Sequence, residues 1–225
     1  ARKVVKYDDL NQIKVSYKER YSLNPKITYE GDLKLPTKHS IDYYLLKKEE
    51  EPKIPINVMF LDIETFTETR VHSNAQDTED PIAIIRYSYN NIKKSLVLDP
   101  KVLKINDQVI DLNSKDITIC NSEAQLLSTF FNDVRNLDPD FVSGWYSNDF
   151  DMQYILNRSK KINVDPTRMS KFGEADYNKF QFYPNAAGIV FLDMLELNKR
   201  FTFGVRESYT LYIIGNIELK KGKTE

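Results

Sequence analysis

The stretch NVMFLDIETFTE, residues 57–68, carries a run of apolar residues into two acidic residues, Asp62 and Glu64. Successive side chains of a strand point to opposite faces, so Asp62 and Glu64 should project together from the end of a buried strand. Two neighbouring carboxylates repel each other, and burying them is costly unless a cation lies between them. Carboxylate oxygens suit Mg²⁺ or Mn²⁺, and pairs of such ions promote phosphodiester hydrolysis.

The same spacing recurs once more, at Asp77 and Glu79. No apolar strand precedes that copy, so it is interpreted as a solvated loop. The spacing alone therefore does not establish a metal site. The alternative for Asp62 and Glu64 is an exposed strand end without a ligand.

The composition of the 225-residue chain is typical of a soluble globular protein, with 41% hydrophobic and 29% charged residues. The net charge of -1 gives no bulk indication of a nucleic-acid partner, although local basic patches could still bind one. No apolar run approaches the ~18 residues of a membrane span, so no membrane association is expected. Cys120 is expected to be a buried free thiol, and His72 a surface histidine.

The order of elements favours an α/β fold, because strand-like runs come first and strands then alternate with helices. Residues 1–52 predict part of a small β-rich domain with a charged linker, and residues 53–225 predict a second domain. Strands are expected at residues 56–62, 82–89, 94–99, 108–112, 117–120, 141–145 and 188–194, and helices at 121–138, 148–161 and 195–203.

A third acid, Asp151, lies in the first turn of the helix expected after the strand FVSGW. Acidic residues are stabilised near a helix N-terminus, so capping is one interpretation, and Asp149 fits it equally well. A strand-end acid pair with a helix-start acid is also the layout of a metal site. Such a site would need a third or fourth carboxylate to complete two metal shells.

Four segments together resemble the family B DNA polymerases. FLDIET (60–65) and GWYSNDFDMQYILNR (144–158) resemble the first and second exonuclease motifs of that family. VFLDMLELNKRFTFGVRESYTLYIIGNIELKKGK (190–223) resembles the segment that follows, and TYEGDLKLPTKHSIDYYL (28–45) the N-terminal stretch. The phage and archaeal branches are the most similar.

The resemblance implies an RNase H-like mixed sheet flanked by helices, and a 3′→5′ proofreading exonuclease that uses two divalent ions, Mg²⁺ or Mn²⁺. It assigns Asp62, Glu64 and Asp151 as catalytic residues and metal ligands. The implied partners are a single-stranded 3′ end of DNA and the polymerase domain of a longer protein. The implied location is the cytoplasm, or the host cytoplasm for a viral protein.

Four residues are predicted to contact the substrate. Phe66, Tyr146 and Phe150 border the expected site and could stack on unpaired bases, with core packing as the alternative for Phe150. The family has Asn where this chain has Tyr146, and Asn148 is the candidate to replace it.

The family's third motif, a Tyr followed four residues later by Asp, is expected beyond Glu225. Within the chain, Tyr209 is followed at that offset by Ile213, and Tyr212 by Asn216. The chain is therefore expected to be the N-terminal portion of a larger polymerase. Two alternatives remain: a stand-alone nuclease completed by another acid such as Asp193, which otherwise caps a helix, and a non-catalytic module that binds single-stranded DNA or docks onto a polymerase.

Overall fold

A computed structural model describes residues 41, 43, 55–68, 72–103, 115–178, 183–202, 204 and 206–219. The chain divides into two units between Ile54 and Pro55, and the sheets and helices that follow all belong to the second unit. Apart from Ile41 and Tyr43, the expected β-rich domain at residues 1–52 and the segment 28–45 lie outside the described residues, as does the strand at 108–112, so they stay predictions, and so does the boundary at residue 53.

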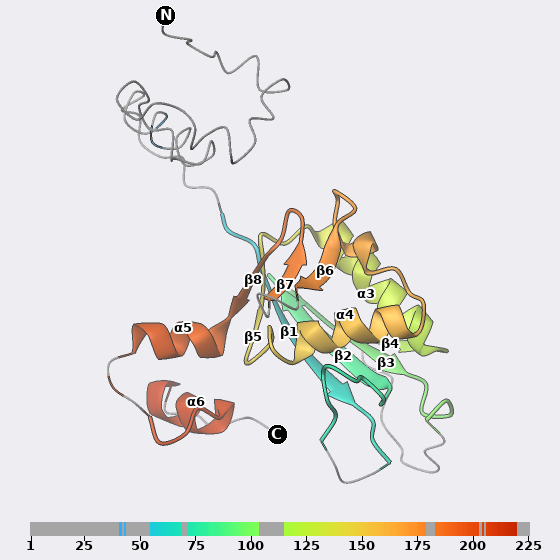
Figure 1. Ribbon diagram of the computed structural model, residues 1–225, viewed down its shortest axis with the longest axis horizontal. Helices are drawn as coiled ribbons and strands as arrows, with labels where there is room; N and C mark the ends of the chain where they lie inside the picture. Colours follow the sequence, from blue (N-terminus) through green and yellow to red (C-terminus); the bar gives the residue numbers. More distant parts are fainter. Residues whose placement is uncertain are drawn as a thin grey trace, which may run out of the picture. The chain divides into compact units, whose positions relative to one another are not determined.

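Six strands form one mixed sheet in the order β4-β3-β2-β1-β5-β8 (Figure 1). Their bounds are Val58–Thr65 for β1, Ile82–Tyr89 for β2, Ile92–Leu98 for β3, Ile117–Cys120 for β4, Phe141–Gly144 for β5 and Val190–Asp193 for β8. The strand β2 pairs with β1 and with β3 in antiparallel orientation. The remaining pairs, β3 with β4, β1 with β5 and β5 with β8, are parallel. A separate two-stranded sheet joins β6 (Ala175–Asn178) to β7 (Tyr183–Ala186).

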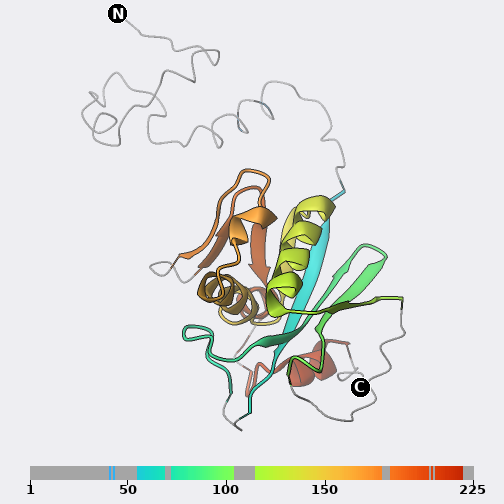
Figure 2. The same cartoon turned by 90° about the vertical axis from the view of Figure 1, so that its right-hand side faces the viewer.

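Two helices, α3 (Glu123–Leu137) and α4 (Asp151–Lys161), pack on the same side of the six-stranded sheet (Figures 1 and 2). The apolar stripe of α3 is buried there: Leu126, Leu127, Phe130, Phe131 and Val134. The Ser122 side chain accepts a hydrogen bond from the Gln125 N–H, so Ser122 rather than Asn121 caps α3. A short 3-10 helix, η2 (Pro166–Met169), and two further helices, α5 (Met194–Phe201) and α6 (Leu211–Leu219), complete the described elements.

The expected α/β fold is confirmed, with a mixed sheet and packed helices that are consistent with an RNase H-like exonuclease fold. A tight turn at Asn90 and Asn91 joins β2 to β3, and Asn90 adopts a left-handed φ of 52° there. Cys120 is a buried free thiol, as expected. None of the helices in the described segments is long and apolar enough to cross a membrane.

Three expectations were wrong in detail. The first strand does not end at Asp62 but continues to Thr65, so Asp62 and Glu64 lie within it. The region between α4 and β8 was expected to be a polar loop, yet it forms η2 and the β6–β7 sheet. Residues 211–219 were not expected to be helical, because their apolar side chains follow no helical period.

Candidate active site

Asp62 and Glu64 project from one face of the central strand β1. The alternate residues Leu61 and Ile63 point into the core and are only 4% and 5% exposed, whereas both acids are exposed. Neither carboxylate forms a hydrogen bond or an ion pair with another residue in the described segments. The structure therefore places the two acids together on a face of the sheet where a ligand could reach them.

Asp151 reaches the same strand from the side. The strand β5 pairs with β1 only from Val58 to Phe60, and beyond that point the N-terminus of α4 lies beside β1. There the Asp151 Oδ1 accepts a hydrogen bond of 3.0 Å from the Ile63 N–H. Because Ile63 lies between Asp62 and Glu64, this bond brings the third acid to the first two.

Gly144 allows the chain to leave β5 at this place. A Cβ atom at Gly144 would lie 2.6 Å from the Leu61 carbonyl oxygen and 2.8 Å from the Ser147 Cβ. Only glycine permits so close an approach of the two backbones. The glycine of the Gly-Trp step therefore determines how near Asp151 comes to β1.

The environment of Asp151 disfavours its charged form. Its side chain is buried, with the residue 4% exposed. Burial, followed by the negative charge of Asp62, raises the pKa of Asp151 to about 8, although the hydrogen bond from Ile63 acts in the opposite direction. A cation bound between these carboxylates would remove the repulsion and favour the ionised form.

The chemistry of these donors fits a hard divalent cation, because all three side chains offer only carboxylate oxygens. The described segments contain no group of three His, Cys, Asp or Glu side chains already converged around an ion. Asp62, Glu64 and Asp151 would therefore have to draw together, and gain further ligands, when an ion binds. This fit rests on donor type and on the disfavoured ionisation of Asp151.

Asp193 has a different role from that of a metal ligand. It is 4% exposed, and its carboxylate accepts three backbone hydrogen bonds: 3.1 Å from Tyr146, 3.1 Å from Asn148 and 2.9 Å from Leu195. The last of these caps α5, as the sequence predicted. The other two hydrogen bonds hold the loop that joins β5 to α4, so Asp193 helps to fix the position of Asp151 at the start of α4.

Neither Asp149 nor Asp151 caps α4, because the N-cap residue is Phe150 and no side-chain hydrogen bond is made there. Asp149 instead lines a cavity of about 440 Å³ with Tyr146 and Phe150. Burial, with Asp193 and Glu196 nearby, raises the pKa of Asp149 above its usual range. The sequence alone left the choice between the two acids open, and only Asp151 contacts β1.

Two of the four predicted substrate residues share this cavity, Tyr146 and Phe150. Tyr146 is 48% exposed and adopts a left-handed φ of 63°, a conformation that disfavours tyrosine. Phe150 is half-buried and packs against Tyr154, with ring centroids 5.7 Å apart. Phe66 follows β1 and its N–H bonds to the Pro81 carbonyl, and it does not line the cavity.

Asn148, the fourth predicted residue, is 8% exposed, and its Oδ1 has no hydrogen-bond partner in the described part of the chain. The sequence did not indicate the other residues that line the cavity, among them His72, Gln153 and Tyr177. His72 was interpreted as an isolated surface histidine, and Tyr177 lay in a region expected to be a loop. Gln153 lies near Phe150 because both belong to the start of α4, whereas His72 and Tyr177 reach the cavity through tertiary packing, for which the sequence held no local signal.

One face of α4 holds the loop between β1 and β2 in place. Tyr154 donates to the Asp80 carbonyl at 2.7 Å, and Asn157 donates to the Ala75 carbonyl at 2.8 Å. Arg158 donates to the Thr78 carbonyl at 2.8 Å. The helix that begins with Asp151 therefore also positions the loop that follows Asp62 and Glu64.

Comparison with known proteins identifies the family. Residues 11–214 match the family described as DNA polymerase family B, exonuclease domain. The DNA-directed DNA polymerase of Escherichia phage RB69 is 31% identical over 112 residues, which are 46% of this chain and 12% of that protein. The DNA-directed DNA polymerase of Enterobacteria phage T4 is 30% identical over 112 residues, also 46% and 12% of the two chains.

An archaeal relative, the DNA polymerase of Thermococcus gorgonarius, is 27% identical over 136 residues, which are 60% of this chain and 15% of that protein. The matched part thus spans only a small fraction of these polymerases, 12% of each phage protein. The family match, in contrast, covers nearly the whole chain and includes Asp62 and Glu64 of β1 and Asp151 of α4. The chain therefore belongs to the exonuclease-domain family of the family B DNA polymerases.

Proposed function

We propose that this protein hydrolyses the terminal phosphodiester at the 3′ end of single-stranded DNA, as the proofreading exonuclease of a family B polymerase. Membership of the exonuclease-domain family supports the reaction class. The observation that carries the assignment of residues is the 3.0 Å hydrogen bond from Ile63 to Asp151, because it joins the second motif to the first.

Exonuclease domains of this family generally use divalent metal ions. We assign Asp62, Glu64 and Asp151 to hold Mg²⁺ or Mn²⁺, two ions in a complete site. The chemistry that such ions supply when bound is Lewis-acid activation of water and stabilisation of the leaving oxygen. Asp62 and Glu64 offer their oxygens from the open face of β1, and Asp151 is held in register by the Ile63 N–H.

The cavity beside α4 suits the terminal nucleotides. The rings of Tyr146 and Phe150 provide apolar faces on which an unpaired base can stack. Asn148 lies in the loop with Tyr146, and its amide oxygen has no hydrogen-bond partner among the described residues, whereas Phe66 directly follows the last residue of β1, Thr65. These four residues form the proposed substrate contacts, and Asp193 holds the loop that carries Tyr146 and Asn148.

The proposed partners are a single-stranded 3′ end and the polymerase domain of a longer protein. Each relative named above is called a DNA polymerase, and each is much longer than the matched part. We place the activity where such DNA is replicated, in the cytoplasm of a cell or, for a viral protein, of its host.

The direct test is Mn²⁺-dependent degradation of a 3′-labelled single strand. Wild type should release labelled mononucleotide, and Asp62→Ala should reduce the rate at least ~100-fold, as expected when a catalytic ligand is lost. Asp77→Ala is the matched control, because Asp77 and Glu79 repeat the spacing in an exposed loop. Equal rates for wild type and Asp62→Ala would refute the site, and DNA binding without hydrolysis would favour a non-catalytic module.

A further inference from the structure

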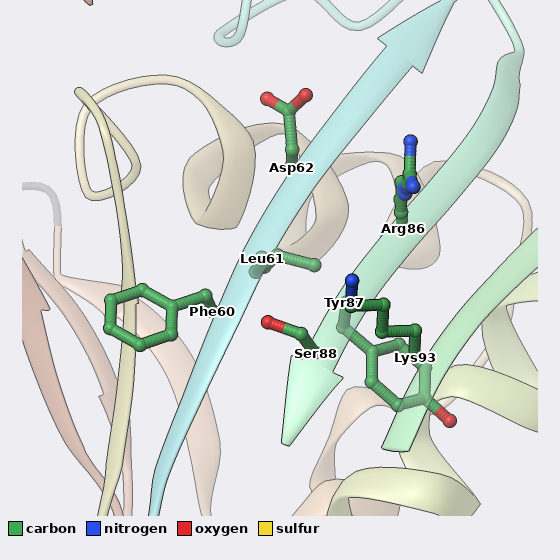
Figure 3. A pocket seen from close by; sticks show the side chains of 7 residues that line it. All are labelled: Phe60, Leu61, Asp62, Arg86, Tyr87, Ser88 and Lys93. Atoms are coloured by element: carbon green, nitrogen blue, oxygen red, sulfur yellow. The ribbon is translucent and has the colours of Figure 1, made fainter. Parts of the chain in front are cut away.

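A second groove lies beside Asp62 (Figure 3), and it shares no lining residue with the cavity at Tyr146. Its volume is about 260 Å³. Three adjacent strands line it, and the lining includes the core residues Leu61 and Tyr87. The outward-facing residues that line it are Phe60 and Asp62 of β1, Arg86 and Ser88 of β2, and Lys93 of β3. These residues alternate with the core residues of their strands, so the groove follows the face of the sheet that α3 and α4 do not cover.

The register of the strands explains how the charges are arranged. Arg86 lies directly opposite Asp62, and Ser88 lies opposite both Phe60 and Lys93. In Figure 3 the side chains of Asp62 and Arg86 stand side by side and point the same way. Arg86 and Lys93 are two residues and one strand apart, a Cα separation of about 8 Å from ordinary sheet spacings.

Within the described residues, neither Arg86 nor Lys93 has a charged protein partner. Although Arg86 is opposite Asp62, no ion pair joins them, and neither Arg86 nor Lys93 hydrogen-bonds to another side chain in the described segments. The neighbouring Lys94 points to the other face and contacts Asp133 at 2.7 Å. The charges on the groove side are therefore available to an anion, whereas the one on the core side is already neutralised.

Phe60 adds an aromatic surface to the same groove. It is 49% exposed although it lies in a central strand, where side chains of this size are normally covered. Grooves that bind single-stranded nucleic acid without sequence preference combine backbone-tracking cations with exposed aromatic rings on which bases stack. The groove offers both features, and it begins at an acid of the proposed active site.

We propose that Phe60, Arg86 and Lys93 bind the single-stranded DNA that leads to the scissile phosphate. Arg86 and Lys93 contact successive phosphates, and Phe60 stacks on a base between them. This inference rests on the proposed function for the position of the 3′ end, but the contacts themselves require no hydrolysis. The occupant is single-stranded DNA rather than a protein surface, because two unpaired cations need an anion.

The experiment measures the affinity of a fluorescent oligothymidylate by anisotropy in EDTA, across a range of salt concentrations. The variant Arg86→Ala/Lys93→Ala should bind roughly tenfold more weakly at ~0.1 M salt and should lower the slope of log K against log[salt] by about 1.4, since two phosphate contacts are lost. Phe60→Ala should weaken binding by a similar factor without changing the slope.

Two variants control for charge and for folding. Lys101→Ala/Arg168→Ala removes the same charge at exposed positions outside the groove and should leave the slope unchanged. Arg86→Lys/Lys93→Arg keeps both charges and should restore the wild-type slope. Circular dichroism of each variant confirms that the fold is retained.

If Arg86→Ala/Lys93→Ala left the slope of log K against log[salt] unchanged, the proposal that the groove binds DNA would be wrong. The same conclusion would follow if the control Lys101→Ala/Arg168→Ala lowered the slope equally. The Mn²⁺-dependent hydrolysis assay distinguishes a failure of the groove proposal from a failure of the proposed exonuclease function. Hydrolysis that needs Asp62, together with an unchanged slope, would keep the exonuclease and reject the groove. A reduced slope without any hydrolysis would keep the groove and reject the exonuclease.

Discussion

The carboxylate of Asp151 takes the place of a strand partner for Ile63. Its Oδ1 accepts the Ile63 N–H at 3.0 Å, on the side of β1 where β5 has already ended. A backbone donor that the sheet leaves unpaired is thereby satisfied by an acid from the N-terminus of α4. The same contact places Asp151 beside the segment of β1 that carries Asp62 and Glu64, so the geometry of the site depends on where β5 stops.

The first prediction concerns the pH dependence of stability. The folded protein keeps a proton on Asp151 up to a pKa of about 8, whereas an unfolded chain releases it near the ordinary value of 3.8. Between these values the free energy of unfolding should fall as pH rises, by up to ~1.4 kcal/mol per pH unit for this one group. Asp151→Asn should remove that loss and be more stable than wild type near pH 8.

Urea unfolding in EDTA at several pH values between ~5 and ~8 measures this difference. Asparagine can still accept the Ile63 N–H, so the hydrogen bond is retained in the variant. Parallel pH profiles for wild type and Asp151→Asn would contradict the burial of an acid at this position.

The second prediction concerns the backbone at Gly144. Gly144→Ala would place a Cβ 2.6 Å from the Leu61 carbonyl oxygen, which is backbone of β1, and 2.8 Å from the Ser147 Cβ, so the turn between β5 and α4 would have to shift. The variant should lose about 1–3 kcal/mol of stability and most of its nuclease activity.

Gly173→Ala is the matched control. A Cβ at Gly173 meets no atom within 4 Å, but its φ of 74° makes alanine unfavourable by ~1 kcal/mol. This control should lose stability and keep its activity. Equal behaviour of the two variants would show that the approach of β5 to β1 does not position Asp151.

The third prediction concerns Tyr146. Its φ of 63° is unfavourable for tyrosine and acceptable for asparagine, the residue that the family has at this place. Tyr146→Asn should therefore raise stability by roughly 0.5–1 kcal/mol while weakening the binding of single-stranded DNA, because a stacking surface is lost. Thermal unfolding and anisotropy measure the two effects.

Tyr212→Asn serves as the comparison, because Tyr212 is also exposed but lies in α6 with an ordinary helical backbone. It should not gain stability. A destabilised Tyr146→Asn protein would mean that the tyrosine ring contributes packing that outweighs the strain of its backbone.

The fourth prediction concerns Arg158, which binds Glu123 through two hydrogen bonds of 2.9 and 2.8 Å and also donates to the Thr78 carbonyl. Both charged side chains are nearly buried, at 12% and 11% exposure. Arg158→Ala would leave Glu123 without its cation and should cost about 3 kcal/mol. The loop after β1 should then be cut faster by proteases at residues 72–80.

Arg168→Ala, at an exposed arginine, should change neither stability nor cleavage. For Arg158→Ala, KM for DNA should rise more than kcat falls, since the loop lines the cavity but carries none of the three acids. Unchanged cleavage at residues 72–80 would show that α4 does not hold this loop.

Sequence patterns predicted those parts of the fold that depend on local order. The apolar run before Asp62 predicted β1, and the spacing of Leu126, Phe130 and Val134 predicted α3. The β6–β7 sheet escaped prediction because its strands are short and polar and one contains Pro184. Such strands form through pairing with each other, which a single segment does not reveal.

The site was predictable only in part for the same reason. Strand alternation places Asp62 and Glu64 on one face from sequence alone. The contact between Asp151 and Ile63 spans 88 residues and depends on the early end of β5, for which no local pattern exists. The arrangement of Phe60, Arg86 and Lys93 likewise required the register of three strands.

The most direct test of the central claim, that Asp62, Glu64 and Asp151 act as one metal site, is titration of Mn²⁺ followed by electron paramagnetic resonance. Wild type should bind Mn²⁺ and release protons near neutral pH, because the ion displaces the proton from Asp151. Asp62→Ala should lose this binding at least ~10-fold, and Asp77→Ala should match wild type. Mn²⁺ binding by Asp62→Ala with wild-type affinity would contradict the shared metal site.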